Sequence, residues 1–151
     1  MPPYLWIALG GAIGSVARGW FSTAAARWWG SGFPWGTMAI NVGGSFLIGL
    51  FAALTLPGGR FAGNADLRAF VMVGICGGFT TFSSFSLQTL ELLREGRGLA
   101  ALGNVAGSVL LCLAATAAGY ALAAPPVPSS TVAAMADEET GRPGPRPPAR
   151  G

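Results

Sequence analysis

The chain has 151 residues, of which 52% are hydrophobic and only 10% are charged, and its mean hydropathy is +0.54. A soluble domain carries about a quarter charged residues, so this composition indicates an integral membrane protein. The net charge is +3 with nine arginines and no histidine; no basic stripe is present to follow nucleic-acid phosphates, and acid–base catalysis lacks its usual groups.

Four apolar segments are long enough to cross a bilayer, which takes about 20 residues. They are predicted at 4–28, 36–57, 67–93 and 98–123. Turn-forming residues separate them, and the first has no basic n-region or cleavage site, so we expect a retained span and not a signal peptide. We therefore expect an all-α transmembrane domain over residues 1–124. The Pro- and Ala-rich residues 125–151 are expected to form a disordered tail.

The arginines near the segment ends give almost no orientation signal. Arg60 and Arg68 lie on one predicted side, and Arg27, Arg94 and Arg97 lie on the other. Arginine bias across short loops sets topology, so we expect copies to insert both ways and pair as an antiparallel, dual-topology homodimer. Insertion in a single orientation with a weak signal is the alternative.

Asn41 lies inside the second segment. Burying an amide in lipid without partners costs several kcal/mol, so Asn41 must face the protein interior, a neighbouring helix or water. It either only joins helices, which is worth about 1 kcal/mol, or belongs to a polar path with groups from the third and fourth segments.

The third segment contains two adjacent glycines, Gly77 and Gly78, followed by a hydroxyl-rich stretch. Each glycine weakens a helix by about 1 kcal/mol relative to Ala, and lipid tolerates a broken backbone only where protein or a water-filled cavity satisfies it. We expect a break near Gly77–Thr80. Unwound carbonyls there are suited to a small cation, although the glycines could equally permit helix crossing.

Phe82 and Phe85 are three residues apart and therefore share one helix face. Such a pair most often packs. However, ring edges are electropositive, and edges beside a pore would attract an anion without trapping it.

Three stretches together resemble the Fluc (CrcB) family of fluoride channels: 10–18, 36–46 and 77–86. The resemblance implies a dual-topology homodimer of four-helix subunits in the bacterial inner membrane, with two fluoride pores and a structural sodium ion at the dimer interface. It implies that Gly77 and Thr80 supply backbone oxygens to sodium. It places five residues along the fluoride path: Asn41, Phe82, Phe85, Ser108 and Arg18. The hydroxyls of Thr81 and Ser83, in the hydroxyl-rich stretch, are expected to line the same path as donors.

In this resemblance, Asn41 donates its amide to the ion, the edges of Phe82 and Phe85 meet fluoride, and Arg18 resembles a vestibule arginine that concentrates anions. Arg18 could instead only extend to the membrane surface. One position departs from the family: Asn104 stands where tyrosine is frequent, one turn before Ser108. The pair keeps a polar helix face, but the detailed route and conductance become doubtful.

Passive export of fluoride, which protects a cell against fluoride toxicity, is the expected function. A small proton-coupled drug exporter is the closest alternative, but it needs an acid inside the membrane, and Asp66, Glu91 and Glu95 all lie near predicted segment ends. A non-transporting membrane scaffold would explain the glycines and leave Asn41 and the hydroxyls without a purpose.

Overall fold

The computed structural model describes residues 2–30 and 32–125, and all regular secondary structure in these residues is helical. The predicted tail, apart from Pro125, lies outside the described residues. The elements are α1 (Pro3–Trp29), α2 (Trp35–Leu54), α3 (Ala65–Arg68), the π-helix η1 (Ala69–Cys76), α4 (Gly77–Phe79), α5 (Phe82–Arg94) and α6 (Gly98–Ala123).

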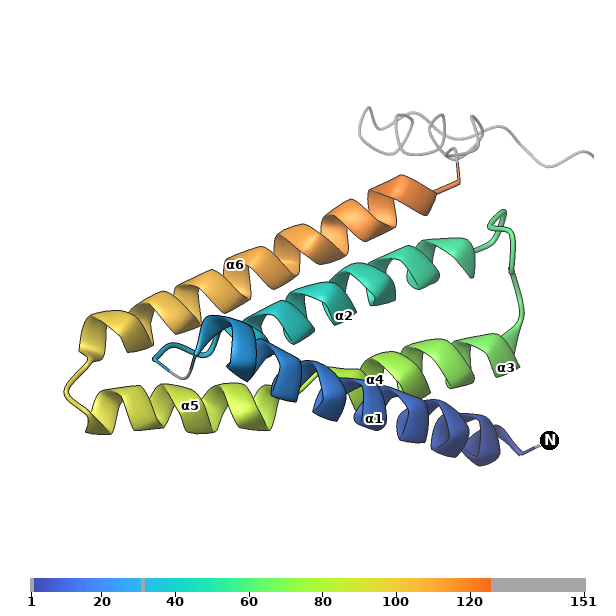
Figure 1. Ribbon diagram of the computed structural model, residues 1–151. Helices are drawn as coiled ribbons and strands as arrows, with labels where there is room; N and C mark the ends of the chain where they lie inside the picture. The colour runs from blue at the N-terminus through green and yellow to red at the C-terminus, as the bar shows by residue number, and fades with distance from the viewer. Residues whose placement is uncertain (1, 31, 126–151) are drawn as a thin grey trace, which may run out of the picture.

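The third predicted segment consists of four successive helices, α3, η1, α4 and α5, with an interruption between α4 and α5. Figure 1 shows α2 and α6 side by side, with α1 crossing the third segment near its middle. Three stretches of the described chain are long and apolar enough to cross a membrane: Trp35–Leu54, Ala65–Arg94 and Gly98–Ala123. The 27-residue α1 is not among the helices that are apolar enough to count as candidate spans. The helices therefore establish a membrane protein with three candidate spans.

Most predicted bounds agree with the helices to within two residues, but the second segment was predicted too long at its end. It was expected to reach residue 57, whereas α2 ends at Leu54. The reason is local, because Pro57 has no N–H to donate to the Ala53 carbonyl and the residue before a proline disfavours the helical conformation. In the last turn, the N–H and the hydroxyl of Thr55 both donate to the carbonyls of Phe51 and Ala52.

Close glycine contacts hold the helices together in two places. Where α1 crosses the third segment, a Cβ added at Gly78 would lie 2.6 Å from the Gly11 carbonyl oxygen, and one added at Gly74 would lie 2.8 Å from the Gly10 Cα. Where α2 crosses α6, a Cβ at Gly49 or Gly119 would meet the backbone of the opposite helix. Small residues thus let the backbones approach, as expected for membrane helices.

The helix break lies at the far end of the predicted interval. Gly77 and Gly78 are helical and belong to α4, whereas Thr80 (φ −74°, ψ 156°) and Thr81 (φ −150°, ψ 106°) are extended. Gly78 lets α1 approach closely. Helix crossing was the alternative role that the sequence allowed for these glycines. The break itself therefore needs a cause other than glycine flexibility.

Candidate functional site

The break is bound by one side chain from α2. The Asn41 amide Nδ2 donates to the Thr81 carbonyl oxygen at 3.1 Å, and the Thr81 N–H donates to Asn41 Oδ1 at 2.8 Å. A continuous helix would donate this N–H to the carbonyl of Gly77. The pairing with Asn41 therefore leaves the Gly77 carbonyl without its usual helical donor.

Two further side chains define the ends of the break. The guanidinium Nη1 of Arg18, on α1, donates to the Thr80 carbonyl oxygen at 3.4 Å. The hydroxyl of Thr81 accepts the Ser84 N–H at 3.2 Å, so Thr81 is the N-cap of α5. An N-cap side chain satisfies one of the N–H groups that the start of a helix leaves free, so α5 restarts in a defined direction.

A groove of about 350 Å³ runs beside the break. It is lined by six of the predicted site residues, from three segments of the chain: Asn41, Gly77, Thr80, Phe82, Phe85 and Ser108. The other lining residues are mostly small or apolar. The sequence-based prediction therefore grouped residues that the fold brings together.

The two phenylalanines line the groove in different ways. Their ring centroids are 5.3 Å apart with the planes inclined at 45°. Phe85 is buried at 8% exposure, while Phe82 is 78% exposed. Packing accounts for Phe85 within this chain but not for Phe82.

A hydrogen-bonded chain of polar side chains joins α5 to α6 behind Phe85. Ser108 Oγ donates to Asn104 Oδ1 at 3.5 Å, Asn104 Nδ2 donates to Thr89 Oγ1 at 2.8 Å, and Thr89 Oγ1 donates to the Phe85 carbonyl at 2.7 Å. Asn104 is only 1% exposed. The predicted polar face of Asn104 and Ser108 is thus present, and Thr89 is a member that the sequence analysis missed, because hydroxyls on helices commonly bond only to the preceding turn.

The remaining predicted residues lie elsewhere. Arg18 and Thr81 line a second, wider hollow of about 650 Å³, together with Gln88, Glu91 and Arg97 among others. Ser83 is exposed and lines neither hollow, although its hydroxyl lies 3.2 Å from that of Thr81.

The second hollow carries both signs of charge. Arg97 forms an ion pair with Glu95 at 3.3 Å, and both side chains line the hollow. Gln88 Oε1 is buried there without a hydrogen-bond partner within the described part of the chain. Gln88 was not singled out from the sequence, since a single amide in a polar stretch is not a distinctive signal.

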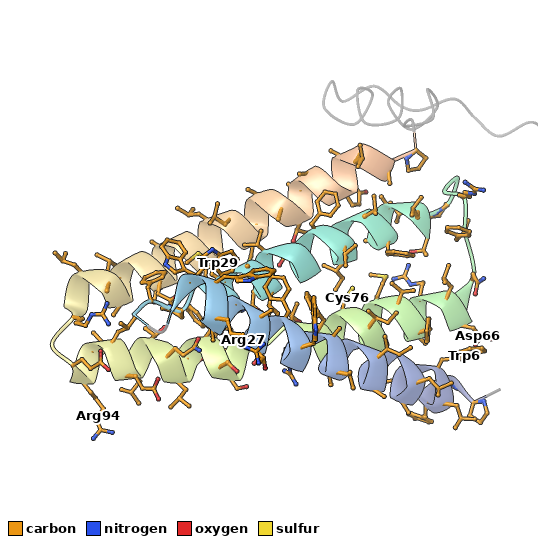
Figure 2. All side chains as sticks on the ribbon, in the orientation of Figure 1. Trp6, Arg27, Trp29, Asp66, Cys76 and Arg94 are labelled. Carbon is orange, nitrogen blue, oxygen red and sulfur yellow. The ribbon has the colours of Figure 1, made fainter. Side chains whose placement is uncertain are left out.

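The acids stand near the ends of the molecule. Figure 2 shows Asp66 at one end, and Arg94, which is followed in sequence by Glu95, at the other. Asp66, Glu91 and Glu95 are all exposed. Within residues 2–30 and 32–125, no group of three or more His, Cys, Asp or Glu side chains is placed to hold a metal ion.

Comparison with known proteins gives consistent matches over most of the chain. The sequence profile of the CrcB-like proteins (Camphor Resistance, CrcB) matches residues 5–120. A protein from Methylocella silvestris is 55% identical over 120 residues, which is 80% of this chain and 92% of that protein. One from Opitutus terrae is 58% identical over 120 residues, 80% and 91% of the two chains, and one from Rhodospirillum rubrum is 57% identical over 110 residues, 73% and 85%. Each of the three is named fluoride-specific ion channel FluC.

Proposed function

The chain belongs to the CrcB family, and on that premise we propose that it is a fluoride-specific ion channel that lets fluoride leave the cell passively. It is a channel and not an enzyme. The observation that carries the route is the groove beside the break, where an amide, two aromatic rings and a buried hydroxyl meet: Asn41, Phe82, Phe85 and Ser108.

The groove has the chemistry that a small, strongly hydrated anion needs. Fluoride must replace lost water with hydrogen-bond donors. The second N–H of the Asn41 amide, which Thr81 does not use, can supply one, and the Ser108 hydroxyl can supply another by turning away from its 3.5 Å contact with Asn104 Oδ1. The ring edges of Phe82 and Phe85 add a weak positive potential. A set of neutral partners binds firmly enough for entry and weakly enough for release.

A second copy of the chain would complete the path. Phe82 is 78% exposed although it borders the groove, and an antiparallel homodimer would cover such a ring and close the open side of each groove. In this assembly α1 is the fourth span, and each copy spans the inner membrane of a bacterium. Glycine-mediated packing within one copy leaves the outer faces of α5 and α6 available for the partner.

A structural sodium ion fits the break in chemistry. Gly77 and Thr80 both border the groove, and the Gly77 carbonyl has lost its usual helical donor to the Asn41 pairing. The Gly77 carbonyl would therefore supply one backbone oxygen, and the Thr80 carbonyl would supply another through the lone pair that its 3.4 Å contact with Arg18 leaves free. Carbonyls at helix breaks bind cations in other membrane proteins. The bound ion would add a fixed positive charge between the two copies.

The test is ion flux from sealed proteoliposomes. We expect the purified protein to release fluoride down its gradient with little release of chloride, and without movement of protons in exchange. Vesicles that retain fluoride while they move protons or organic cations would reject the proposal and favour the drug-exporter alternative.

A further inference from the structure

Asn41 uses both ends of its amide on one backbone residue, Thr81. Because Thr81 presents one donor and one acceptor, this pairing fixes the orientation of the amide. It also uses only one of the two N–H groups on Nδ2, so the other remains available to the groove that Asn41 lines. A contact with the ion and a bond to the backbone are therefore compatible in the same side chain.

The Asn41 amide replaces hydrogen-bond partners that the backbone of Thr81 loses at the break. An extended Thr81 takes its N–H away from the carbonyl one turn earlier, and its own carbonyl lies beside the restart of α5. A backbone group left without a partner at membrane depth is costly. The amide of Asn41, which lies 40 positions earlier in the chain, satisfies the N–H and provides a donor to the carbonyl.

The fold seats α2 closely enough for this bond to form. Gly44 lies about one turn after Asn41 on α2, and a Cβ added at Gly44 would collide with Cγ2 of Thr80. The lack of a side chain at Gly44 therefore lets α2 approach the break. Arg18 holds the neighbouring carbonyl of Thr80 from α1, so the break is held from two sides.

The position of Thr81 determines where the aromatic rings stand. Thr81 is the N-cap of α5, Phe82 is the first residue of that helix, and Phe85 follows one turn later. We infer that Asn41 is a positioning residue: it holds the break in its extended form and thereby sets the start of α5 and the places of both rings. This inference deepens the proposed function and rests on it for the role of the rings.

The Thr81 amide can be observed by itself. Thr80–Thr81 is the only Thr–Thr pair in the chain, so protein labelled with carbonyl-¹³C and ¹⁵N threonine gives a single amide signal in a spectrum that correlates each N–H with the preceding carbonyl. Hydrogen exchange at this signal, measured in fluoride-free micelles, reports the Asn41–Thr81 bond without any contribution from transport.

Three variants separate positioning from ion contact. Asn41→Leu removes both bonds at similar size, and we expect exchange at Thr81 to accelerate by about tenfold, the scale of one net hydrogen bond. Asn41→Asp keeps an acceptor for the Thr81 N–H, so exchange should stay near the wild-type rate. Ser108→Ala changes the same groove without touching the break, and we expect it to leave exchange unchanged.

The outcomes decide the inference in each case. Faster exchange in Asn41→Leu alone supports it. Unchanged exchange in Asn41→Leu, with fluoride flux reduced, would show that Asn41 acts only on the ion and would overturn it. If Asn41→Leu does not fold, Asn41→Ala decides: faster exchange at Thr81 supports the pairing and unchanged exchange overturns it. A wild-type protein with a protected Thr81 amide and no fluoride flux would reject the proposed function and leave the pairing intact.

Discussion

Substitution of Gly119 by alanine tests the packing of α2 against α6. A Cβ at Gly119 would collide with the Phe46 carbonyl oxygen and lie 3.0 Å from the backbone N of Leu50. The contact is reciprocal, because a Cβ at Gly49 would meet the carbonyl group of Thr116. All these atoms belong to helix backbones, which cannot turn aside as a flexible side chain can.

The expected cost follows from two opposing effects. Added volume in a packed interface costs about 1–3 kcal/mol, and the upper part of that range applies here because whole helices must separate. Alanine is a better helix former than glycine by at most about 1 kcal/mol. We therefore expect Gly119→Ala to lower the free energy of unfolding by about 1–2 kcal/mol.

Gly103, on the same helix, provides a matched control. A Cβ at Gly103 meets nothing within 4 Å in the described part of the chain, so Gly103→Ala should be neutral or slightly stabilising. The assay is unfolding of each purified variant in mixed micelles with increasing denaturing detergent, followed by tryptophan fluorescence. Equal midpoints for the two alanine variants would refute the claim that backbone contact at Gly119 limits how closely α2 and α6 approach.

Three other substitutions probe the groove and its surroundings. Phe82→Ile should reduce fluoride flux by up to about tenfold, since it removes an aromatic edge worth about 0.5–1.5 kcal/mol; unchanged flux would mean that the ring only packs. Asn104→Leu should destabilise the protein by about 1–3 kcal/mol, because Thr89 and Ser108 both lose a buried partner, as thermal unfolding would record. Arg18→Gln should lower flux most at low ionic strength, where long-range attraction of anions is least screened; an equal loss at all salt concentrations would assign Arg18 to the Thr80 contact alone.

The extents of the helices could be read from the sequence because the signals that set them are local. The last predicted segment, 98–123, coincides with α6, since turn residues precede it and prolines follow it. The end of α2 was misplaced because the predicted segment was drawn through Pro57, whereas a helix usually ends at or before the residue that precedes a proline.

The sequence placed the break only within the interval Gly77–Thr80, because tertiary contacts decide where in that interval the helix ends. Intrinsic propensity points to Gly77 and Gly78 as the weakest residues, yet both are helical, and Gly78 packs directly against α1. The chain extends three residues after Gly77, at Thr80, and Thr81 then finds its partner in a distant amide. The π-helix over Ala69–Cys76 was also not anticipated, since its sequence is uniformly apolar and shows no distinctive pattern.

The site shows the same division. Residue chemistry singled out Asn41, Phe82 and Phe85, the family resemblance added Ser108, and the fold gathers all four around one groove. Thr81 was predicted to line the same path, but it is not among the residues that line the groove. Its hydroxyl caps α5 and its backbone bonds to Asn41, and neither contact could be inferred from residue type alone.

Donors and acceptors at the break are divided in a way that favours opposite charges on its two sides. On the α5 side, the Thr81 hydroxyl caps Ser84, and Asn41 binds both backbone groups of Thr81. These contacts direct the start of a helix, where the macrodipole is positive, toward the rings that border the groove. On the α4 side, the Gly77 carbonyl has lost its N–H at the end of a helix, where the dipole is negative. A cation on the carbonyl side and an anion on the ring side would each meet the favourable end of a dipole. One interruption of the backbone can therefore serve both ions without an acidic or basic side chain among the residues that line the groove.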